Sequence, residues 1–260
     1  MIRTVLLDKG VARAATSVTR LSGPTRRRIH VACRQDGCCR WRLFRHRLLD
    51  RRIEGADVII ASRNADRLKA AADKLGARAI AADVTSDESI AQLFRQCGAI
   101  DHVVVTAAQL RTGPFRTVSM DDVRATMEGK FWGAWRVARA AGIRAGGSLT
   151  LVSGYFSVRP RPGVAIVSAA NGALESLTRC LPLELAPVRV NAVSPGLIDT
   201  PIRAAMPEAA RREMLAKTAA ALPVGRVGLP EDVAKQIMAF MTIGFATGTI
   251  VYLDGGGLIV

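Results

Sequence analysis

The sequence predicts an α/β fold with a single doubly wound parallel sheet. From residue 55 onward, short runs rich in Val and Ile alternate with longer stretches of helical periodicity, a pattern typical of βαβ units. The 260 residues are 49% hydrophobic, enough for one domain with a large core. We therefore expect residues 53–260 to form that domain and residues 1–52 to form a separate basic segment.

The first half of this domain is predicted to contain three strands and three helices. The strands are expected at residues 56–61, 77–82 and 101–106, and the helices at 65–75, 86–97 and 121–141. Gly76 is a stop signal for the first helix, and Ser86 is a suitable N-cap for the second. The unbroken run Val103, Val104 and Val105 indicates a central strand that is buried on both faces.

The second half continues the same alternation. Strands are expected at residues 148–153, 188–192 and 249–253, and helices at 168–185, 208–221 and 231–241. No apolar run approaches the roughly 20 residues that a bilayer-spanning helix needs. The apolar run within residues 1–8 is too short for a secretory signal, so we expect a cytoplasmic protein without membrane contact.

The positive charge is concentrated at one end of the chain. Of the formal +15, residues 1–52 hold 14 Lys and Arg against 3 Asp and Glu. The main domain is nearly balanced, which makes a nucleic-acid partner unlikely for it. The five cysteines are odd in number, which argues against a closed disulfide framework.

Residues 174–201 carry the most informative motif, LESLTRCLPLELAPVRVNAVSPGLIDTP. This run resembles the end of the active-site helix, the sixth strand and the nicotinamide-side loop of the short-chain dehydrogenase/reductase family. The resemblance covers about residues 53–260. It implies a Rossmann fold, a nicotinamide cofactor, a small-molecule carbonyl or alcohol substrate, and a homodimer or homotetramer that packs through the helix at 168–185.

The glycine-rich phosphate loop of that family is missing, and we predict a frameshift over about residues 34–52. One permitted set of codons for residues 34–48, read from its second base, encodes GKTVVVGGGSSGIG, a strand running into a glycine fingerprint. Such a loop lets the pyrophosphate approach a helix N-terminus. If the printed residues stand instead, the first βα unit is disrupted and the first strand is lost.

Three other interpretations of the basic segment stay open. It can be a disordered tail, or an arm that binds nucleic acid through its arginine density. It can also hold zinc, although adjacent cysteines are poorly spaced ligands, and we expect no metal. The zinc candidates are His30, Cys33, Cys38, Cys39 and His46.

Ser62 and Arg63 follow the strand at 56–61. An acidic residue there would accept the ribose 2′-hydroxyl and select NAD(H), whereas Ser followed by Arg accommodates a 2′-phosphate. We therefore favour NADP(H) over NAD(H), with a solvated Arg63 as the alternative. Asp83 and Val84 resemble the adenine contact of the family, and a capping role is the alternative for Asp83.

Two further segments carry cofactor residues by resemblance. Residues 105–108, with the sequence VTAA, stand where the family usually has Asn-Asn-Ala-Gly, and the small Ala107 and Ala108 keep the backbone accessible to the ribose. The resemblance implies that Pro195 and Gly196 turn the chain beneath the nicotinamide. It also implies that Ile198 and Thr200 hold the carboxamide of the nicotinamide.

The usual catalytic residues of the family are replaced. Alignment of the motifs puts Val167 at the tyrosine position, Asn171 at the lysine position, Gly154 at the serine position and Lys130 at the asparagine position. A valine cannot transfer a proton, so the ordinary mechanism is excluded. The pattern resembles a divergent branch of the family that lacks the standard active site.

Two functions follow from these departures. In the first, the site is rebuilt: Lys130 and Asn171 exchange places, Tyr155 supplies a phenol and Ser153 lies one residue before the usual serine. The protein is then an NADP(H)-dependent oxidoreductase with an atypical site. In the second, it is a non-catalytic NADP(H)-binding sensor or scaffold. A pocket-lining aromatic is the bland alternative for Tyr155, and a surface cation is that for Lys130.

Overall fold

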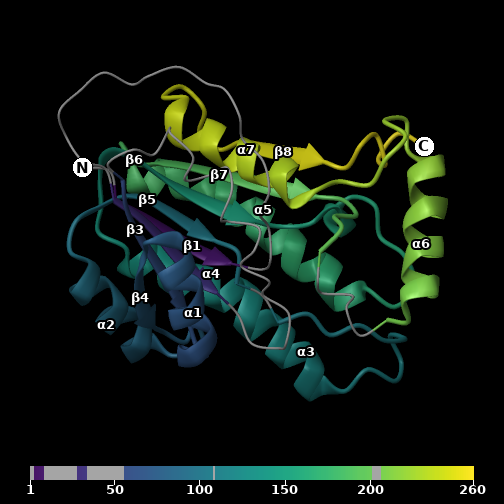
Figure 1. Ribbon diagram of the computed structural model, residues 1–260, viewed down its shortest axis with the longest axis horizontal. Helices are drawn as coiled ribbons and strands as arrows, with labels where there is room; N and C mark the ends of the chain where they lie inside the picture. Colours follow the sequence, from purple (N-terminus) through teal and green to yellow (C-terminus); the bar gives the residue numbers. More distant parts are fainter. Residues whose placement is uncertain (1–2, 9–27, 34–55, 108, 201–205) are drawn as a thin grey trace.

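The computed structural model describes residues 3–8, 28–33, 56–107, 109–200 and 206–260. Its centre is a parallel sheet in the order β4-β3-β1-β2-β5-β6-β7-β8 (Figure 1). The strands are β1 (Arg3–Asp8), β2 (Arg28–Cys33), β3 (Asp57–Ser62), β4 (Arg78–Ala81), β5 (Ile100–Val105), β6 (Ile143–Val152), β7 (Arg189–Pro195) and β8 (Ile250–Leu253). The predicted α/β fold with a parallel sheet is confirmed.

The first α-helices follow the predicted pattern. They are α1 (Ala65–Leu75), α2 (Asp87–Cys97), α3 (Met120–Met127) and α4 (Gly133–Ala140). Gly76 ends α1 in the left-handed conformation at φ 62°, and Ser86 caps α2 by accepting from the amide of Ser89. A π-helical turn, η2 (Glu128–Trp132), separates α3 from α4, so the single helix predicted at 121–141 is wrong.

The later helices are α5 (Ala165–Leu185), α6 (Glu208–Ala221) and α7 (Pro230–Thr242), with a short 3₁₀ turn, η3 (Tyr155–Ser157), before α5. α5 begins three residues before the predicted start. α6 has no buried residue among those described and stands apart at one end of the molecule (Figure 1). None of the helices in the described ranges is long and apolar enough to cross a membrane.

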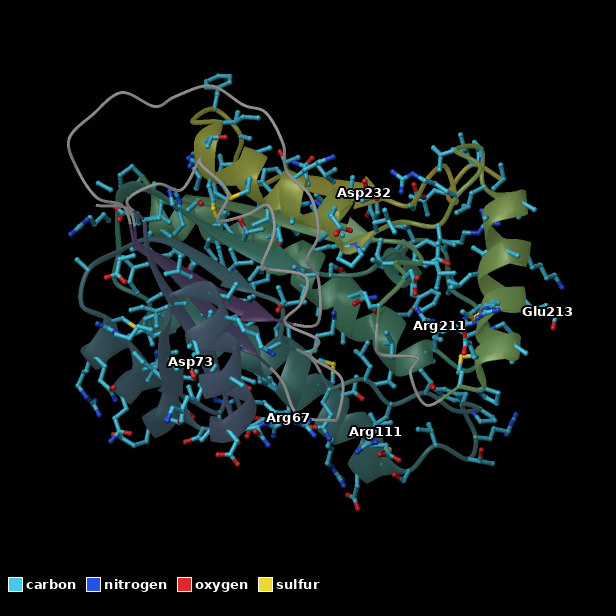
Figure 2. All side chains as sticks on the ribbon, in the orientation of Figure 1. Arg67, Asp73, Arg111, Arg211, Glu213 and Asp232 are labelled. Carbon is cyan, nitrogen blue, oxygen red and sulfur yellow. The ribbon has the colours of Figure 1, made fainter. Side chains whose placement is uncertain are left out.

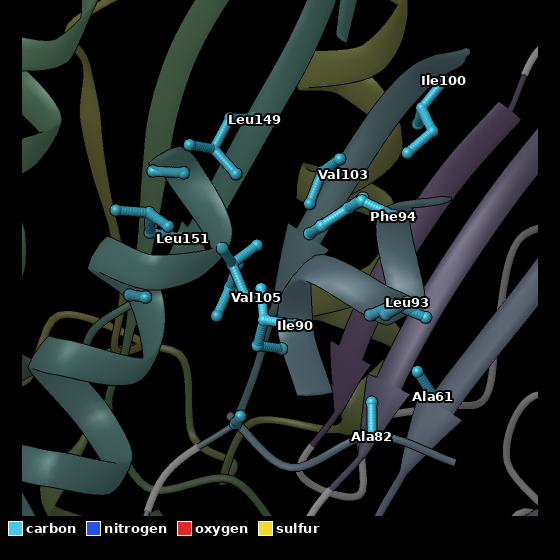
Figure 3. Packing of buried hydrophobic residues seen from close by; sticks show 14 of the residues in the cluster. Ala61, Ala82, Ile90, Leu93, Phe94, Ile100, Val103, Val105, Leu149 and Leu151 are labelled. Carbon is cyan, nitrogen blue, oxygen red and sulfur yellow. The ribbon is translucent and has the colours of Figure 1, made fainter. Parts of the chain in front are cut away.

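Two apolar clusters cover opposite faces of the sheet. One contains residues of α2, α4 and α5, and Figure 3 shows part of it, with Leu93 and Phe94 of α2 near Val103 and Val105 of β5. The other contains residues of α1 and α7. Val103, Val104 and Val105 are 0%, 0% and 2% exposed, which confirms the predicted central strand. Helices on both faces make the sheet doubly wound.

The amino-terminal segment contributes β1 and β2, and each of them pairs with both β3 and β5. Residues 1–52 were expected to lack such elements, with the first strand lost from the printed chain. That expectation is wrong for residues 3–8 and 28–33, which form strands between β3 and β5. The predicted frameshift region, 34–52, lies outside the described residues.

Candidate functional site

Among the predicted site residues, Lys130 lies in η2 and Asn171 in α5. The others end or follow the strands β3, β4, β5, β6 and β7. These strands are parallel, so the loops after them meet at one edge of the sheet. In open α/β sheets this edge is where ligands bind. The edge therefore brings the cofactor candidates and the catalytic candidates into one region.

Lys130 lies in the π-turn and is only 3% exposed, so its interpretation as a surface cation is wrong. Its Nζ donates to the carbonyl oxygens of Val152 at 3.3 Å and Ser153 at 3.2 Å. The turn is held by close packing at two glycines. A Cβ on Gly129 would lie 2.9 Å from the Cβ of Gln109, and one on Gly133 would lie 3.0 Å from a methyl of Val84. The π-turn thus places the buried Lys130 side chain at the end of β6.

Ser153 connects Lys130 to the long helix. Its carbonyl accepts from Lys130, and its Oγ lies 3.1 Å from the carbonyl oxygen of Asn171 and 3.1 Å from Oε1 of Glu175. Asn171 is 2% exposed, and its Oδ1 is buried without a hydrogen-bond partner among the described residues. Ser153 therefore links the side chain of Lys130 to the backbone of Asn171. Val167 is 3% exposed and apolar.

Glu175 is a site residue that the sequence did not reveal. It is 3% exposed and accepts four hydroxyl hydrogen bonds from three strand ends and η3. The donors are Ser153 at 3.1 Å, Ser157 at 2.6 Å, Ser194 at 3.0 Å and Tyr252 at 2.8 Å. Burial, followed by the hydrogen bond to Glu175, raises the pKa of Tyr252. In the sequence, the one signal for Glu175 was its position four residues after Asn171, which puts both residues on the same face of α5.

Tyr155 begins η3 and is half-buried. Its ring stacks on Phe156 with centroids 4.9 Å apart. No hydrogen bond of its hydroxyl to Lys130, Ser153 or Asn171 is found among the described residues. Tyr155 thus follows Ser153 by two residues in the sequence, but its phenol makes no hydrogen bond to these three described residues.

On the cofactor side, Ser62 is the last residue of β3 and is buried. The side chain of Arg63 is 19% exposed, so a freely solvated arginine is wrong, and its Nη1 lies 3.8 Å from Oδ2 of Asp83. Asp83 holds the turn before α2, because its Oδ1 accepts from the amide and hydroxyl of Thr85, both at 2.9 Å. The N-cap of α2 is Ser86, so the capping interpretation of Asp83 is wrong.

Val84 and Ala107 line the same edge. Val84 is half-buried against Gly133, and its carbonyl oxygen lies 3.4 Å from Nη1 of Arg136. Ala107 follows β5 and is 6% exposed. Ala108 lies outside the described residues.

The loop after β7 is shaped by close backbone approach. Pro195 ends the strand, and a Cβ on Gly196 would lie 2.8 Å from the Cα of Asp254, which only glycine tolerates. Ile198 is buried and forms a bridge with Gly228, whose amide donates to the carbonyl of Leu197 at 3.0 Å. Thr200 is half-buried at the end of this described stretch.

The sequence profile described as Enoyl-(Acyl carrier protein) reductase matches residues 51–257. The short-chain dehydrogenase/reductase ATR9 of Stachybotrys chlorohalonatus is 33% identical over 228 residues, covering 79% of this chain and 88% of the relative. The chain belongs to the short-chain dehydrogenase/reductase family.

Solved structures of short-chain dehydrogenases resemble this chain in sequence and in fold. A small-chain dehydrogenase in complex with NADPH is 33% identical, with a TM-score of 0.71 over 80% of this chain and 89% of that one. A short-chain oxidoreductase of Pseudomonas aeruginosa PAO1, bound to NADPH and described as containing an atypical catalytic center, is 26% identical. Its TM-score is 0.73 over 78% of this chain and 87% of that one. The predicted family and its Rossmann-type fold are confirmed.

Proposed function

We propose that this protein is an NADP(H)-dependent oxidoreductase that acts on a carbonyl or alcohol substrate through an atypical active site. The observation that carries the proposal is the buried cluster of Lys130, Ser153 and Asn171 at the ligand-binding edge of the sheet. The family membership and the NADPH-bound relative with an atypical catalytic center support it.

The residues present fit a phosphorylated nicotinamide nucleotide. Arg63 offers a guanidinium whose contact with Asp83, at 3.8 Å, is longer than a hydrogen bond, so its donors can reach a 2′-phosphate. Ser62, Asp83, Val84, Ala107 and Ala108 would hold the adenosine half, and Pro195, Gly196, Ile198 and Thr200 the nicotinamide half. When bound, the nicotinamide supplies or accepts the hydride at the substrate carbon.

The chain's own residues divide the remaining work. Tyr155 supplies the phenol that gives a proton to the substrate oxygen in reduction, or takes it in oxidation. Lys130 holds its ammonium-bearing side chain at the end of β6, where it donates to the carbonyl oxygen of Ser153. Ser153 fixes the end of β6 relative to Asn171.

The test is turnover. Protein expressed from the natural gene is mixed with NADPH and a broad panel of carbonyl compounds, and with NADP⁺ and the matching alcohols. Consumption of NADPH with at least one carbonyl is expected. NADPH binding without turnover over the whole panel contradicts the oxidoreductase.

The second candidate is a non-catalytic NADP(H)-binding sensor or scaffold. Val167 and Asn171 favour it, because they stand at the usual tyrosine and lysine positions. Binding without turnover in the same experiment is the result that this candidate predicts.

The proposal includes a frameshift over about residues 34–52. It is supported by the profile match, which begins at residue 51, and by the glycine fingerprint that the shifted codons encode. Peptide masses of the natural protein across residues 30–56 test it. Masses that match the sequence GGGSSGIG support the frameshift, and masses of the printed residues overturn it.

The proposal also includes a cytoplasmic homodimer or homotetramer that packs through α5 and its neighbours. Leu183 of α5 is 85% exposed, and Trp132 and Trp135 of the adjoining η2 and α4 are 44% and 43% exposed. Large apolar side chains exposed on neighbouring elements favour a covered face.

A further inference from the structure

The two carboxylate oxygens of Glu175 serve different parts of the molecule. Oε1 accepts from the hydroxyls of Ser153 at 3.1 Å, Ser157 at 2.6 Å and Ser194 at 3.0 Å. Oε2 accepts from the hydroxyl of Tyr252 at 2.8 Å. The three serines lie directly after β6, in η3 and in β7. One oxygen atom therefore joins three separate segments of the chain to α5.

The turn η3 begins with Tyr155, the proposed proton donor, and ends with Ser157. Two hydrogen bonds fasten this turn to α5: the hydroxyl of Ser157 donates to Glu175, and that of Ser168 donates to the carbonyl oxygen of Phe156. The ring of Phe156 in turn stacks on that of Tyr155. Because the internal hydrogen bonds of a 3₁₀ turn are poor, contacts with α5 decide where η3 and its phenol lie.

Ser194 connects the same oxygen of Glu175 to the proposed nicotinamide side. It is fully buried in β7 and is followed directly by Pro195 and Gly196, where the loop after β7 begins. Glu175 thus contacts, through one serine each, the segment that carries the phenol and the segment that carries the proposed nicotinamide residues.

We propose that Glu175 is a positioning residue for the proposed oxidoreductase: by holding Ser157 and Ser194 on one oxygen, it sets the place of the Tyr155 phenol relative to the nicotinamide. It acts through the two serines and is not itself a catalytic residue. Such placement matters, because an error of about 1 Å in a reacting geometry can slow a reaction roughly 100-fold. The inference rests on the proposed function.

The role requires an acceptor oxygen and not a negative charge. Glutamine has the same shape as glutamate, and its carbonyl oxygen can accept from the three serines while its amide donates to the hydroxyl oxygen of Tyr252. Leucine fills similar space without an acceptor. Glu175→Gln and Glu175→Leu therefore separate the hydrogen bonds from the packing.

The experiment uses the full-length protein expressed from the natural gene. Ser157→Ala, Ser194→Ala and the two Glu175 variants are compared with wild type. Ser176→Ala is the matched control, because Ser176 adjoins Glu175 on α5 and is exposed. The readouts are the Kd for NADPH, and kcat and KM for the carbonyl compound of the panel that wild type reduces fastest, with a melting curve for each variant.

Ser157→Ala is expected to lower kcat by roughly 10- to 100-fold with an unchanged Kd for NADPH, because only the turn that bears the phenol is released. Ser194→Ala is expected to weaken NADPH binding by roughly three- to tenfold, as the loss of one hydrogen bond does. Glu175→Leu should show both losses, and Glu175→Gln should recover most of them. The control should keep the wild-type constants.

A merely structural carboxylate would lower the melting temperature without separating kcat from the Kd for NADPH. The inference is overturned if Ser157→Ala and Ser194→Ala change the same constant, or if both keep the wild-type constants. It is also overturned if Glu175→Gln loses as much as Glu175→Leu. Where Glu175→Leu fails to fold, the two serine variants decide, since each removes a single hydroxyl. Wild-type protein that turns over no carbonyl compound contradicts the proposed function itself.

Discussion

The proposed cofactor side and the proposed catalytic side of the site are built in different ways. The loop after β7 is held by close backbone approach at Gly196 and Gly228, where a Cβ would collide with a neighbour. The catalytic side is a buried polar network around Lys130, Asn171 and Glu175. Backbone shape constrains which residues can occupy the loop, whereas side-chain chemistry in a network can be exchanged.

The largest effect is expected from breaking the network. Glu175→Ala removes the acceptor of the buried Ser194 hydroxyl and of the half-buried Tyr252 hydroxyl. We expect the free energy of unfolding to fall by about 3 kcal/mol. Urea denaturation measures it. Glu184→Ala, at an exposed position of the same helix, is the control and should change stability little. Equal effects of the two variants would mean that the network does not stabilise the fold.

The next largest effect concerns the affinity for NADPH on the proposed cofactor side. Arg63→Ala removes the guanidinium proposed to hold the 2′-phosphate, so NADPH should bind roughly 10- to 100-fold more weakly, with little change for NADH. Titration with both nucleotides measures the preference. Arg67→Ala, an exposed arginine one turn along α1 (Figure 2), is the matched control. An unchanged preference in Arg63→Ala would refute the assignment of NADP(H) to this residue.

The smallest effect concerns the support of the cofactor loop. Asp232, labelled in Figure 2, accepts two hydrogen bonds from Arg226, at 2.7 and 3.0 Å, and one from the amide of Leu229 at 2.8 Å. The hydrogen bond from Arg226 is the largest cause that lowers the pKa of Asp232 below 3.8. Asp232→Asn should therefore reduce stability by about 1 kcal/mol at pH 7.

The stability difference between wild type and Asp232→Asn should depend on pH. A carboxyl whose pKa is lower in the folded protein stabilises the fold above the unfolded pKa and loses this contribution as the pH falls through the folded pKa. The gap between wild type and Asp232→Asn should be full at pH 7 and shrink below pH 3.8. A gap that stays constant on acidification would contradict an ionic origin. Urea denaturation at pH 7 and pH 3 decides.

The sequence was sufficient for elements with strong local signals. α1 and α2 lie where Gly76 and Ser86 predicted them, because capping is local chemistry. The π-turn was missed, because it depends on packing of Gly129 and Gly133 against distant residues. The strands β1 and β2 were missed because long-range pairing with β3 and β5 forms them in an arginine-rich segment.

The sequence names candidate site residues but does not reveal their surroundings in the fold. Motif alignment located Lys130 and Asn171, whereas their burial depends on tertiary packing. Glu175 was missed because a glutamate in a helix is usually solvated, and its four donors come from distant parts of the chain. The periodicity of a sequence cannot predict contacts with donors so far away in the chain.

The most direct test of the separation between the two sides is Tyr155→Phe, measured for both NADPH affinity and turnover. We predict an unchanged Kd for NADPH and a turnover that falls by roughly 100-fold or more, because the role proposed for the phenol is to move the proton and not to bind the nucleotide. Turnover that survives the substitution, or a loss of NADPH affinity equal to the loss of turnover, would contradict this account.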